Sequence, residues 1–341
     1  MLPAFVERDA VDALVAAQWS RILGEPPAAL DADFFASGGT SLKAARLAGA
    51  LRGASGVKVT LQQVYRLRTF EGIGSALRED GAAGDGRLVT LNAVGAGAPL
   101  LLVPAASGGV VGLHRFGGSP VDRPVHGLQA RGLDPQDGPP SSELAEQVAE
   151  FAEALEASEL PRRLHLAGYC VGGILAYELA RTLADRGWEI ASLVLLNTSL
   201  YCPPLTVEEG MREKLRQIAA DADLPAEVAE QGAEAVLRAL GTGEERAEFD
   251  ARVRVFGSVA AAISGFAPAP ADFPVRLFST EDRDDPADIA ATPGPVTDWP
   301  DLGLPDYRQY PVSVDHFEMI NHAPTLEAVE NVLAELDRPG P

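Results

Sequence analysis

The chain has 341 residues, of which 46% are apolar, and this is enough to build two domains with cores of their own. Its formal net charge of −21 argues against nucleic acid and against an anionic membrane as partners. No apolar run approaches the ~20 residues of a membrane-spanning helix, and the first residues lack the layout of a signal peptide. Because two cysteines do not make a disulfide framework, we expect a protein of the reducing cytoplasm.

The first 80 residues carry the spacing of a small helical bundle. Apolar positions recur at helical intervals over residues 7–23 and 41–53, and shorter helical stretches fill 61–67 and 70–77. Acidic and basic side chains balance in this part, nine of each, so the whole negative excess lies in the remainder. A stretch of Gly, Ala and Asp at 81–86 then predicts a linker between two separate units.

After the linker, the pattern predicts a second domain over 87–341 that is built on a mostly parallel sheet. The predicted strands are short, apolar and continuous: 99–104, 124–128, 164–167, 191–197 and 274–278. Amphipathic helices between them, including a long one around 144–155, are expected to cover both faces of the sheet. Residues 200–268 interrupt the alternation with helical segments rich in Ala and Glu, and we expect them to form a lid over the strand ends.

The clearest motif of the first domain is a serine at the start of a predicted helix. Residues 33–42 read Asp-Phe-Phe-Ala-Ser-Gly-Gly-Thr-Ser-Leu, and this wording resembles the peptidyl carrier (thiolation) domains of nonribosomal peptide synthetases. The resemblance implies a four-helix bundle over 1–80 whose Ser41 carries 4′-phosphopantetheine, attached by a phosphopantetheinyl transferase. Free backbone N–H groups at a helix start suit the incoming phosphate. The alternative is that Ser41 or Thr40 only caps the helix.

The second motif lies at residues 168–172, which read Gly-Tyr-Cys-Val-Gly between a predicted strand and a predicted helix. This is the nucleophile-elbow pattern, with cysteine in place of the usual serine. The glycines permit a sharp turn that exposes the Cys170 side chain, and the helix N-terminus behind it favours the thiolate. The alternative is that Cys170 is an inert packing residue.

Four stretches of the second domain together resemble the type I thioesterase domains that end such synthetases, members of the α/β-hydrolase fold. They are residues 103–109, 123–133, 168–172 and 315–319. The resemblance implies that His316 is the general base and that the backbone N–H groups of Ala105 and Val171 bind the oxyanion. The chain departs from the family at Val103, where a histidine is common, and in a loop that is one residue longer.

The remaining histidines are weaker candidates for the base. His165 is expected in the core because it lies inside the elbow strand. His114, His126 and His322 are expected at the surface or around the site.

The third member of the triad stays open at this point. The family usually carries aspartate at the end of the strand after the elbow helix, and here that position is Asn197. An asparagine can orient the imidazole by accepting its N–H, but it cannot stabilise the imidazolium by charge. One alternative is an acid after a later strand, namely Asp282, Glu281 or Asp284. The other is that Asn197 is only a turn residue at a strand end.

A cysteine nucleophile changes the expected reaction. Transfer of a peptidyl chain from the pantetheine thiol to Cys170 exchanges one thioester for another, so the acyl group stays reactive for a difficult second step. Cysteine-dependent members of the family close β-lactam and β-lactone rings, and by this resemblance we expect intramolecular release as a lactam or lactone, including a strained four-membered ring.

The implied partners are upstream condensation and adenylation domains, and no metal is implied. The alternatives are hydrolytic release of a linear peptide, or an inactive docking didomain in which Cys170 replaces a serine, naturally or by engineering.

Overall fold

The computed structural model describes residues 10–55, 59, 61–78, 87–109, 113, 116, 122–133, 138–200, 204–241, 246–280, 298–314, 316 and 318–338. Contacts along the chain divide it into two compact units. One unit holds Met1–Asp85 and Leu215–Asp250, and the other holds Gly86–Lys214 and Ala251–Pro341. The division into domains at 80 and 87 stays a prediction.

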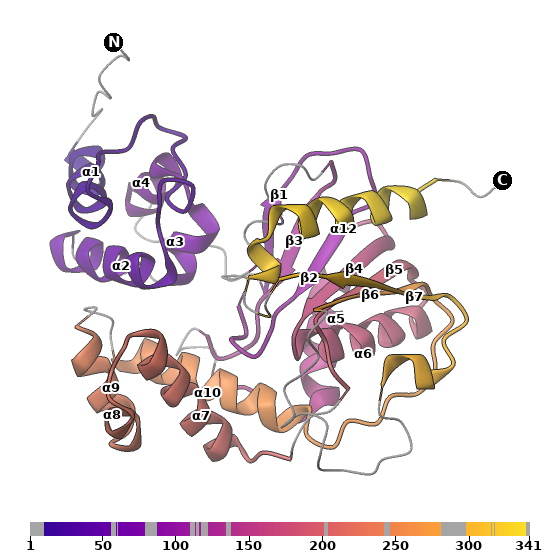
Figure 1. Ribbon diagram of the computed structural model, residues 1–341. Helices are drawn as coiled ribbons and strands as arrows, with labels where there is room; N and C mark the ends of the chain where they lie inside the picture. Colours follow the sequence, from indigo (N-terminus) through magenta and orange to yellow (C-terminus); the bar gives the residue numbers. More distant parts are fainter. Residues whose placement is uncertain are drawn as a thin grey trace. The chain divides into compact units, whose positions relative to one another are not determined.

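The N-terminal segment folds into four helices: α1 (Ala10–Leu23), α2 (Ser41–Ser55), α3 (Leu61–Leu67) and α4 (Phe70–Arg78) (Figure 1). Buried aromatic rings hold them together. Trp19 meets Phe34 and Phe70 edge to face, with ring centroids 5.1 and 6.2 Å apart. Phe35 stacks on Tyr65 at 4.6 Å. Such ring pairs add specific geometry to a large apolar area, and the predicted helical bundle is confirmed.

The second unit is built on a seven-stranded sheet with the order β1-β3-β2-β4-β5-β6-β7 (Figure 1). The strands are β1 (Leu88–Asn92), β2 (Leu100–Val103), β3 (Val125–Leu128), β4 (Arg163–Tyr169), β5 (Glu189–Leu196), β6 (Val275–Thr280) and β7 (Tyr307–Val312). Only β1 pairs antiparallel, with β3, among these neighbouring pairs. Parallel strands bring their carboxyl ends to one edge of the sheet. The predicted mostly parallel sheet is confirmed.

The sequence did not predict the two edge strands, β1 and β7. The central strand β2 is buried along its whole length and therefore reads as an apolar run. By contrast, β7 reads Tyr-Arg-Gln-Tyr-Pro-Val and is exposed or half-exposed throughout. An edge strand has one open side and tolerates polar residues and proline, so it lacks the signal by which the central strands are recognised.

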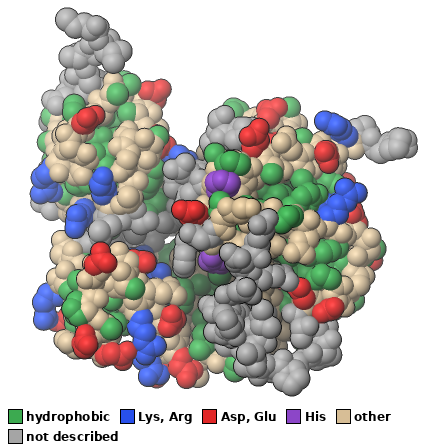
Figure 2. Space-filling view, in the orientation of Figure 1, with side chains coloured by type: hydrophobic (Ala, Val, Ile, Leu, Met, Phe, Trp, Pro, Cys, Tyr) green, Lys and Arg blue, Asp and Glu red, His purple; other side chains and the backbone are tan. Residues whose placement is uncertain are grey.

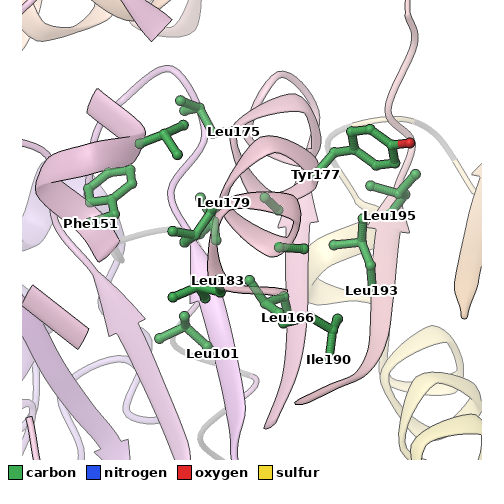
Figure 3. Close-up of a cluster of buried hydrophobic side chains, with 14 of the residues drawn as sticks. Leu101, Phe151, Leu166, Leu175, Tyr177, Leu179, Leu183, Ile190, Leu193 and Leu195 are labelled. Atoms are coloured by element: carbon green, nitrogen blue, oxygen red, sulfur yellow. The ribbon is translucent and has the colours of Figure 1, made fainter. Parts of the chain in front are cut away.

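Helices cover both faces of the sheet. On one face lie α5 (Leu144–Glu156) and α6 (Gly172–Asp185), and Figure 3 shows side chains of this layer, including Phe151, Leu175, Leu179 and Leu183 of the helices and Leu101, Leu166 and Leu193 of the strands. On the other face, α12 (Ala323–Leu336) packs through Leu326, Val329 and Leu333 against Leu100 and Val194. Successive residues of a strand point to opposite faces. One set of these strand side chains packs against α6. This packing holds in place the helix that begins directly after the elbow.

Between β5 and β6 the described chain is largely helical. The helices are α7 (Val207–Asp221), α8 (Ala226–Glu230), α9 (Ala233–Leu240) and α10 (Arg246–Ala262), all within the segment predicted as a lid. Ion pairs on their surface, such as Arg216 with Glu230 at 3.0 Å, are exposed and contribute little individually. On the face shown in Figure 2, acidic and basic side chains are interspersed over these helices. In the described ranges, no helix combines the length and the apolar character needed to span a membrane.

Candidate active site

Cys170 lies at the carboxyl end of β4, in the turn that leads into α6. Its backbone φ is +55°, in the left-handed region where a residue with a side chain is strained. Its N–H donates to the Leu196 carbonyl of β5 at 2.9 Å, and its side chain is half-buried. A strained residue in a strand-to-helix turn is the geometry of a nucleophile elbow, so the structural context that the motif requires is present.

Three glycines make this turn sterically possible. A Cβ on Gly168 would lie 2.6 Å from the carbonyl carbon of Gly172, and a Cβ on Gly172 would lie 2.6 Å from the Pro104 oxygen. A Cβ on Gly173 would lie 2.8 Å from the Cβ of Thr198. Non-bonded Cβ atoms do not approach other atoms this closely, so the start of α6 lies tightly against the loops that follow β2 and β5.

The two backbone N–H groups expected to bind the oxyanion lie beside the same turn. A Cβ on Gly172 would lie 3.0 Å from the Ala105 nitrogen, and Val171 directly follows Cys170. Among the described residues, neither the Ala105 N–H nor the Val171 N–H donates a hydrogen bond. The Ala105 carbonyl in turn accepts from the Gly108 N–H at 2.8 Å, which holds the loop. Two unused donors beside a nucleophile are what an oxyanion site requires.

His316 follows β7 and lies against the elbow strand. The Tyr169 hydroxyl donates to the His316 backbone carbonyl at 2.8 Å, and the two rings have centroids 4.9 Å apart. Tyr169 is the residue directly before Cys170. The structure thus brings the predicted base to the strand that carries the predicted nucleophile.

Asn197 directly follows β5, at a backbone φ of +45°. Its amide Nδ2 lies 2.6 Å from the His316 Nδ1, and its Oδ1 accepts two long hydrogen bonds, both 3.4 Å, from the Thr280 backbone N–H and hydroxyl. An amide nitrogen can only donate, so Nδ1 is the acceptor and the ring proton is on Nε2. This polarity is opposite to the expected one, in which Asn197 accepts from the imidazole. The physical reason is that the two Thr280 donors already face the amide oxygen.

Several other candidates of the sequence analysis cannot be placed relative to this cluster in the described part of the chain. The alternative acids Asp282, Glu281 and Asp284 lie outside the described residues, as do His114 and Cys202.

His165 is a core residue, as predicted. It is fully buried, with Nδ1 2.7 Å from the Ser192 hydroxyl and Nε2 3.1 Å from Asp337. Burial lowers its pKa to about 4, although the neighbouring Asp337 opposes the shift. His126 does not lie at the surface, one of the two places expected for it, because its side chain is buried on β3, between β1 and β2 in the sheet.

Sequence reasoning missed the residues that hold the site together. Besides Tyr169 and Thr280, the buried Trp299 donates its indole N–H to the Thr198 carbonyl at 2.8 Å, next to Asn197. Of these three residues, only Tyr169 could have been found from the sequence, because it lies inside the elbow motif. Thr280 and Trp299 lie 83 and 101 residues from their partners, so these contacts leave no local pattern.

Ser41 lies at the start of a helix, as the sequence pattern predicts. Ser41 is the first residue of α2, and the Thr40 hydroxyl accepts from the Lys43 N–H at 3.3 Å, so Thr40 supplies the cap of this helix. A Cβ on Gly39 would overlap the Phe34 ring, which explains why a glycine precedes the cap. The Ser41 side chain itself lies outside the described part of the structure.

The strand order, the elbow and the helices on both faces define an α/β-hydrolase fold. Within this class, the thioesterase domain family matches residues 98–335, which is most of the chain, so the protein belongs to the thioesterase family of enzymes. Residues 13–77 match the phosphopantetheine attachment site family, so the chain also carries an attachment site for this cofactor.

Curated relatives are synthetases of which the chain matches a small part. It is 29% identical over 210 residues to an indigoidine synthase of Streptomyces lavendulae, covering 61% of this chain and 16% of that protein. It is 28% identical over 197 residues to malpinin synthetase of Mortierella alpina, covering 56% and 2%. It is 34% identical over 178 residues to vanchrobactin synthetase of Vibrio anguillarum, covering 49% and 6%.

Solved structures share the fold. A four-domain nonribosomal peptide synthetase in its holo form aligns with a TM-score of 0.59 at 21% identity, over 98% of this chain and 26% of that one. The NocB thioesterase domain aligns with a TM-score of 0.53 at 23% identity, over 73% and 99%. A Vlm2 thioesterase domain bound with a dodecadepsipeptide aligns with a TM-score of 0.53 at 24% identity, over 74% and 99%.

Proposed function

We propose that this chain performs the release step of a nonribosomal peptide synthetase. Residues 1–80 would be the carrier domain, 81–86 the linker and 87–341 the thioesterase domain, with a lid over about 200–268. The observation that carries the proposal is the 2.6 Å contact between Asn197 and His316 beside the Cys170 elbow. The Asn197–His316 pair lies beside the strand-to-helix turn in which α/β-hydrolases carry their nucleophile, and this supports the assignment of Cys170. The synthetase relatives support the same assignment.

Each residue has a role in the first half-reaction. The phosphopantetheine on Ser41 would supply the peptidyl chain as a thioester. Cys170 Sγ attacks the acyl carbonyl, a new C–S bond forms, and the original C–S bond breaks. His316 accepts the thiol proton and returns it to the departing thiolate. The Ala105 and Val171 N–H groups stabilise the charge that develops on the carbonyl oxygen.

The second half-reaction releases the product as a lactam or a lactone. An amine or hydroxyl of the same acyl chain attacks the carbonyl, and the C–S bond to Cys170 breaks. His316 carries the proton from the attacking group to Cys170 Sγ. Because the acyl-cysteine is a thioester, it is more electrophilic than the oxoester that a serine would form. The greater electrophilicity accelerates a ring closure that would otherwise be slow, including closure of a four-membered ring.

Acylation can be tested with a peptidyl N-acetylcysteamine thioester and intact-protein mass spectrometry. We expect one acyl adduct on the wild-type protein and on Cys202→Ala, and none on Cys170→Ala. The Cys202→Ala variant controls for the second thiol of the chain. An adduct that persists in Cys170→Ala, or no adduct on the wild type, would contradict the proposal.

Product analysis with the same substrate separates cyclisation from hydrolysis. The wild type is expected to release a cyclic product, and Cys170→Ser to release mainly the linear acid. If Cys170→Ser cyclises as well as the wild type, the thioester argument fails. A linear product from the wild type would establish the hydrolytic alternative instead.

The carrier half of the proposal has a test of its own. A phosphopantetheinyl transferase with coenzyme A should add one phosphopantetheine to the wild type and to Thr40→Ala, and none to Ser41→Ala. The proposed partners upstream are condensation and adenylation domains, and the proposed compartment is the reducing cytoplasm, where the Cys170 thiol stays available. Loading of Ser41→Ala would contradict the assignment of the serine.

A further inference from the structure

We propose that Thr280 holds the Asn197 amide in its observed orientation and, through its hydroxyl, permits the amide to turn, so that it governs which imidazole nitrogen of His316 carries the proton. The proposal rests on the proposed function, because it concerns the base of that reaction. Thr280 is the last residue of β6, and Asn197 follows the last residue of β5. The parallel register pairs Leu196 with Phe278, and the Asn197 N–H donates to the Phe278 carbonyl at 2.7 Å. The sheet itself therefore brings Thr280 to the Asn197 side chain.

The observed orientation of the Asn197 amide keeps the His316 imidazole in a tautomer that cannot act as a base towards Cys170. Nδ1 of His316 accepts from the Asn197 amide at 2.6 Å, so the ring proton is on Nε2. With Nδ1 engaged by Asn197, proton transfer with Cys170 has to use Nε2. A neutral ring that already carries its proton on Nε2 can donate there but cannot accept.

A half-turn of the amide about its Cβ–Cγ bond gives the basic form. Oδ1 of Asn197 then accepts from the His316 Nδ1–H, and Nε2 carries the lone pair that can accept the Cys170 proton. In this orientation the amide NH2 faces Thr280. The Thr280 backbone N–H cannot accept a hydrogen bond, but its hydroxyl can both donate and accept. The hydroxyl is thus the one group of Thr280 that satisfies the amide in both orientations.

An aspartate at position 197 would have no such choice, since both of its oxygens accept. The Asn197–Thr280 pair therefore makes this site differ from one with a carboxylate in the same place. The proton of His316 moves to Nδ1 only when the amide turns, and Thr280 is the positioning residue that permits the turn.

The first test compares two substitutions of Thr280 in the full chain. Thr280→Val keeps the shape of the side chain and removes its hydroxyl, whereas Thr280→Ser keeps the hydroxyl. We expect Thr280→Val to slow Cys170 acylation by about tenfold, the effect of one lost hydrogen bond, and Thr280→Ser to remain near the wild-type rate. The proposal would be overturned if Thr280→Val acylated Cys170 at the wild-type rate, or if Thr280→Ser slowed acylation as much as Thr280→Val.

The second test reads the proton directly and needs no substrate. In the 15N spectrum of histidine-labelled protein, His316 is assigned by its absence from a His316→Gln sample. We expect the Nε2–H tautomer in the free wild type and Nδ1 protonation in Asn197→Asp, with the His165 signals unchanged as a control for folding. Nδ1 protonation in the free wild type would overturn the proposal. Because this readout does not depend on acylation, it separates a failure of the proposal from a failure of the proposed function.

Discussion

At the scale of single residues, hydrogen bonds to the sheet keep two site residues in strained backbone conformations. Cys170 and Asn197 both have positive φ values, +55° and +45°. A conformation of this kind costs on the order of 1–3 kcal/mol for a residue with a side chain. Each N–H donates to the next strand, from Cys170 to the Leu196 carbonyl at 2.9 Å and from Asn197 to the Phe278 carbonyl at 2.7 Å. The two residues thus occupy equivalent turns at the ends of neighbouring strands.

Substitution of Tyr169 by phenylalanine tests how the base is positioned. Loss of the 2.8 Å hydrogen bond to the His316 carbonyl should loosen this residue and slow Cys170 acylation by about tenfold. The acylation rate is measured by rapid quenching and mass spectrometry. Tyr307→Phe on the edge strand β7 is the control and should keep the wild-type rate. Equal rates in all three proteins would show that the Tyr169 hydroxyl does not position the base.

Substitution of Gly173 by alanine tests the packing behind the elbow. The new Cβ would lie 2.8 Å from the Thr198 Cβ and would overlap the rest of that side chain. We expect the free energy of unfolding to fall by about 2 kcal/mol, as overpacking does in other cores. In the Thr198→Ala background the same change should cost less, because part of the obstacle is gone. Strictly additive losses in urea denaturation would mean that the two positions are not in conflict.

At the scale of elements, a buried polar cluster fastens α12 to the sheet. Arg123, which is 1% exposed, donates to both oxygens of Glu330 at 2.9 and 3.2 Å and to Asp337 at 2.8 Å. Asp337 also accepts from Arg163 at 2.8 Å and lies 3.1 Å from His165 Nε2. Burial alone would raise the Asp337 pKa, but the hydrogen bonds from Arg163 and Arg123 hold this pKa well below its usual range. One carboxylate thus joins the end of α12 to β4 and to the residue that leads into β3.

Replacing Asp337 by asparagine should loosen this attachment. The change removes one of the two carboxylates that pair with the buried Arg123, and loss of a hydrogen bond to a charged group costs about 1.5–3 kcal/mol. We expect faster hydrogen exchange in α12 and β4, measured by mass spectrometry of the full chain. Glu335→Gln removes an exposed charge from the same helix and should leave the exchange unchanged. Equal protection in both variants would contradict the role assigned to Asp337.

At the scale of the whole molecule, the same cluster makes stability depend on pH. The folded-state pKa of His165, about 4, lies below its ordinary value of 6.5, chiefly because burial disfavours the charged ring. As pH falls below 6.5, the unfolded chain takes up this proton before the folded one, so the free energy of unfolding falls between pH 6.5 and 4. The depressed pKa of Asp337 adds a second loss below its ordinary value of 3.8.

Urea denaturation across this pH range checks the assignment. We expect His165→Gln to flatten the decline between pH 6.5 and 4, because the variant has no ring to protonate. The second loss, at lower pH, should remain, since Asp337 keeps its two arginine partners. If the free energy of unfolding of His165→Gln falls as steeply between pH 6.5 and 4 as that of the wild type, groups other than His165 cause this decline.

Much of the fold could be predicted from the sequence, because its central elements carry strong local patterns. Five of the seven strands and the four N-terminal helices correspond to predicted segments. The edge strands β1 and β7 could not be predicted, since exposure removes the apolar run that marks a strand. Among the site residues, Cys170 and His316 stand in motifs, whereas Thr280 and Trp299 act only through contacts with residues far away in the sequence.

The sequence by itself determined the kinds of groups in this protein: a thiol in an elbow, a late histidine, an asparagine after the next strand and a serine at a helix start. These follow from spacing and residue type, which are local. Only the tertiary structure decided how the groups meet. That Asn197 presents its amide nitrogen to His316, and that Asp337 fastens α12 to the sheet, depends on side chains from separate strands and helices. Such contacts are set by parallel register and packing, which no single stretch of the sequence encodes.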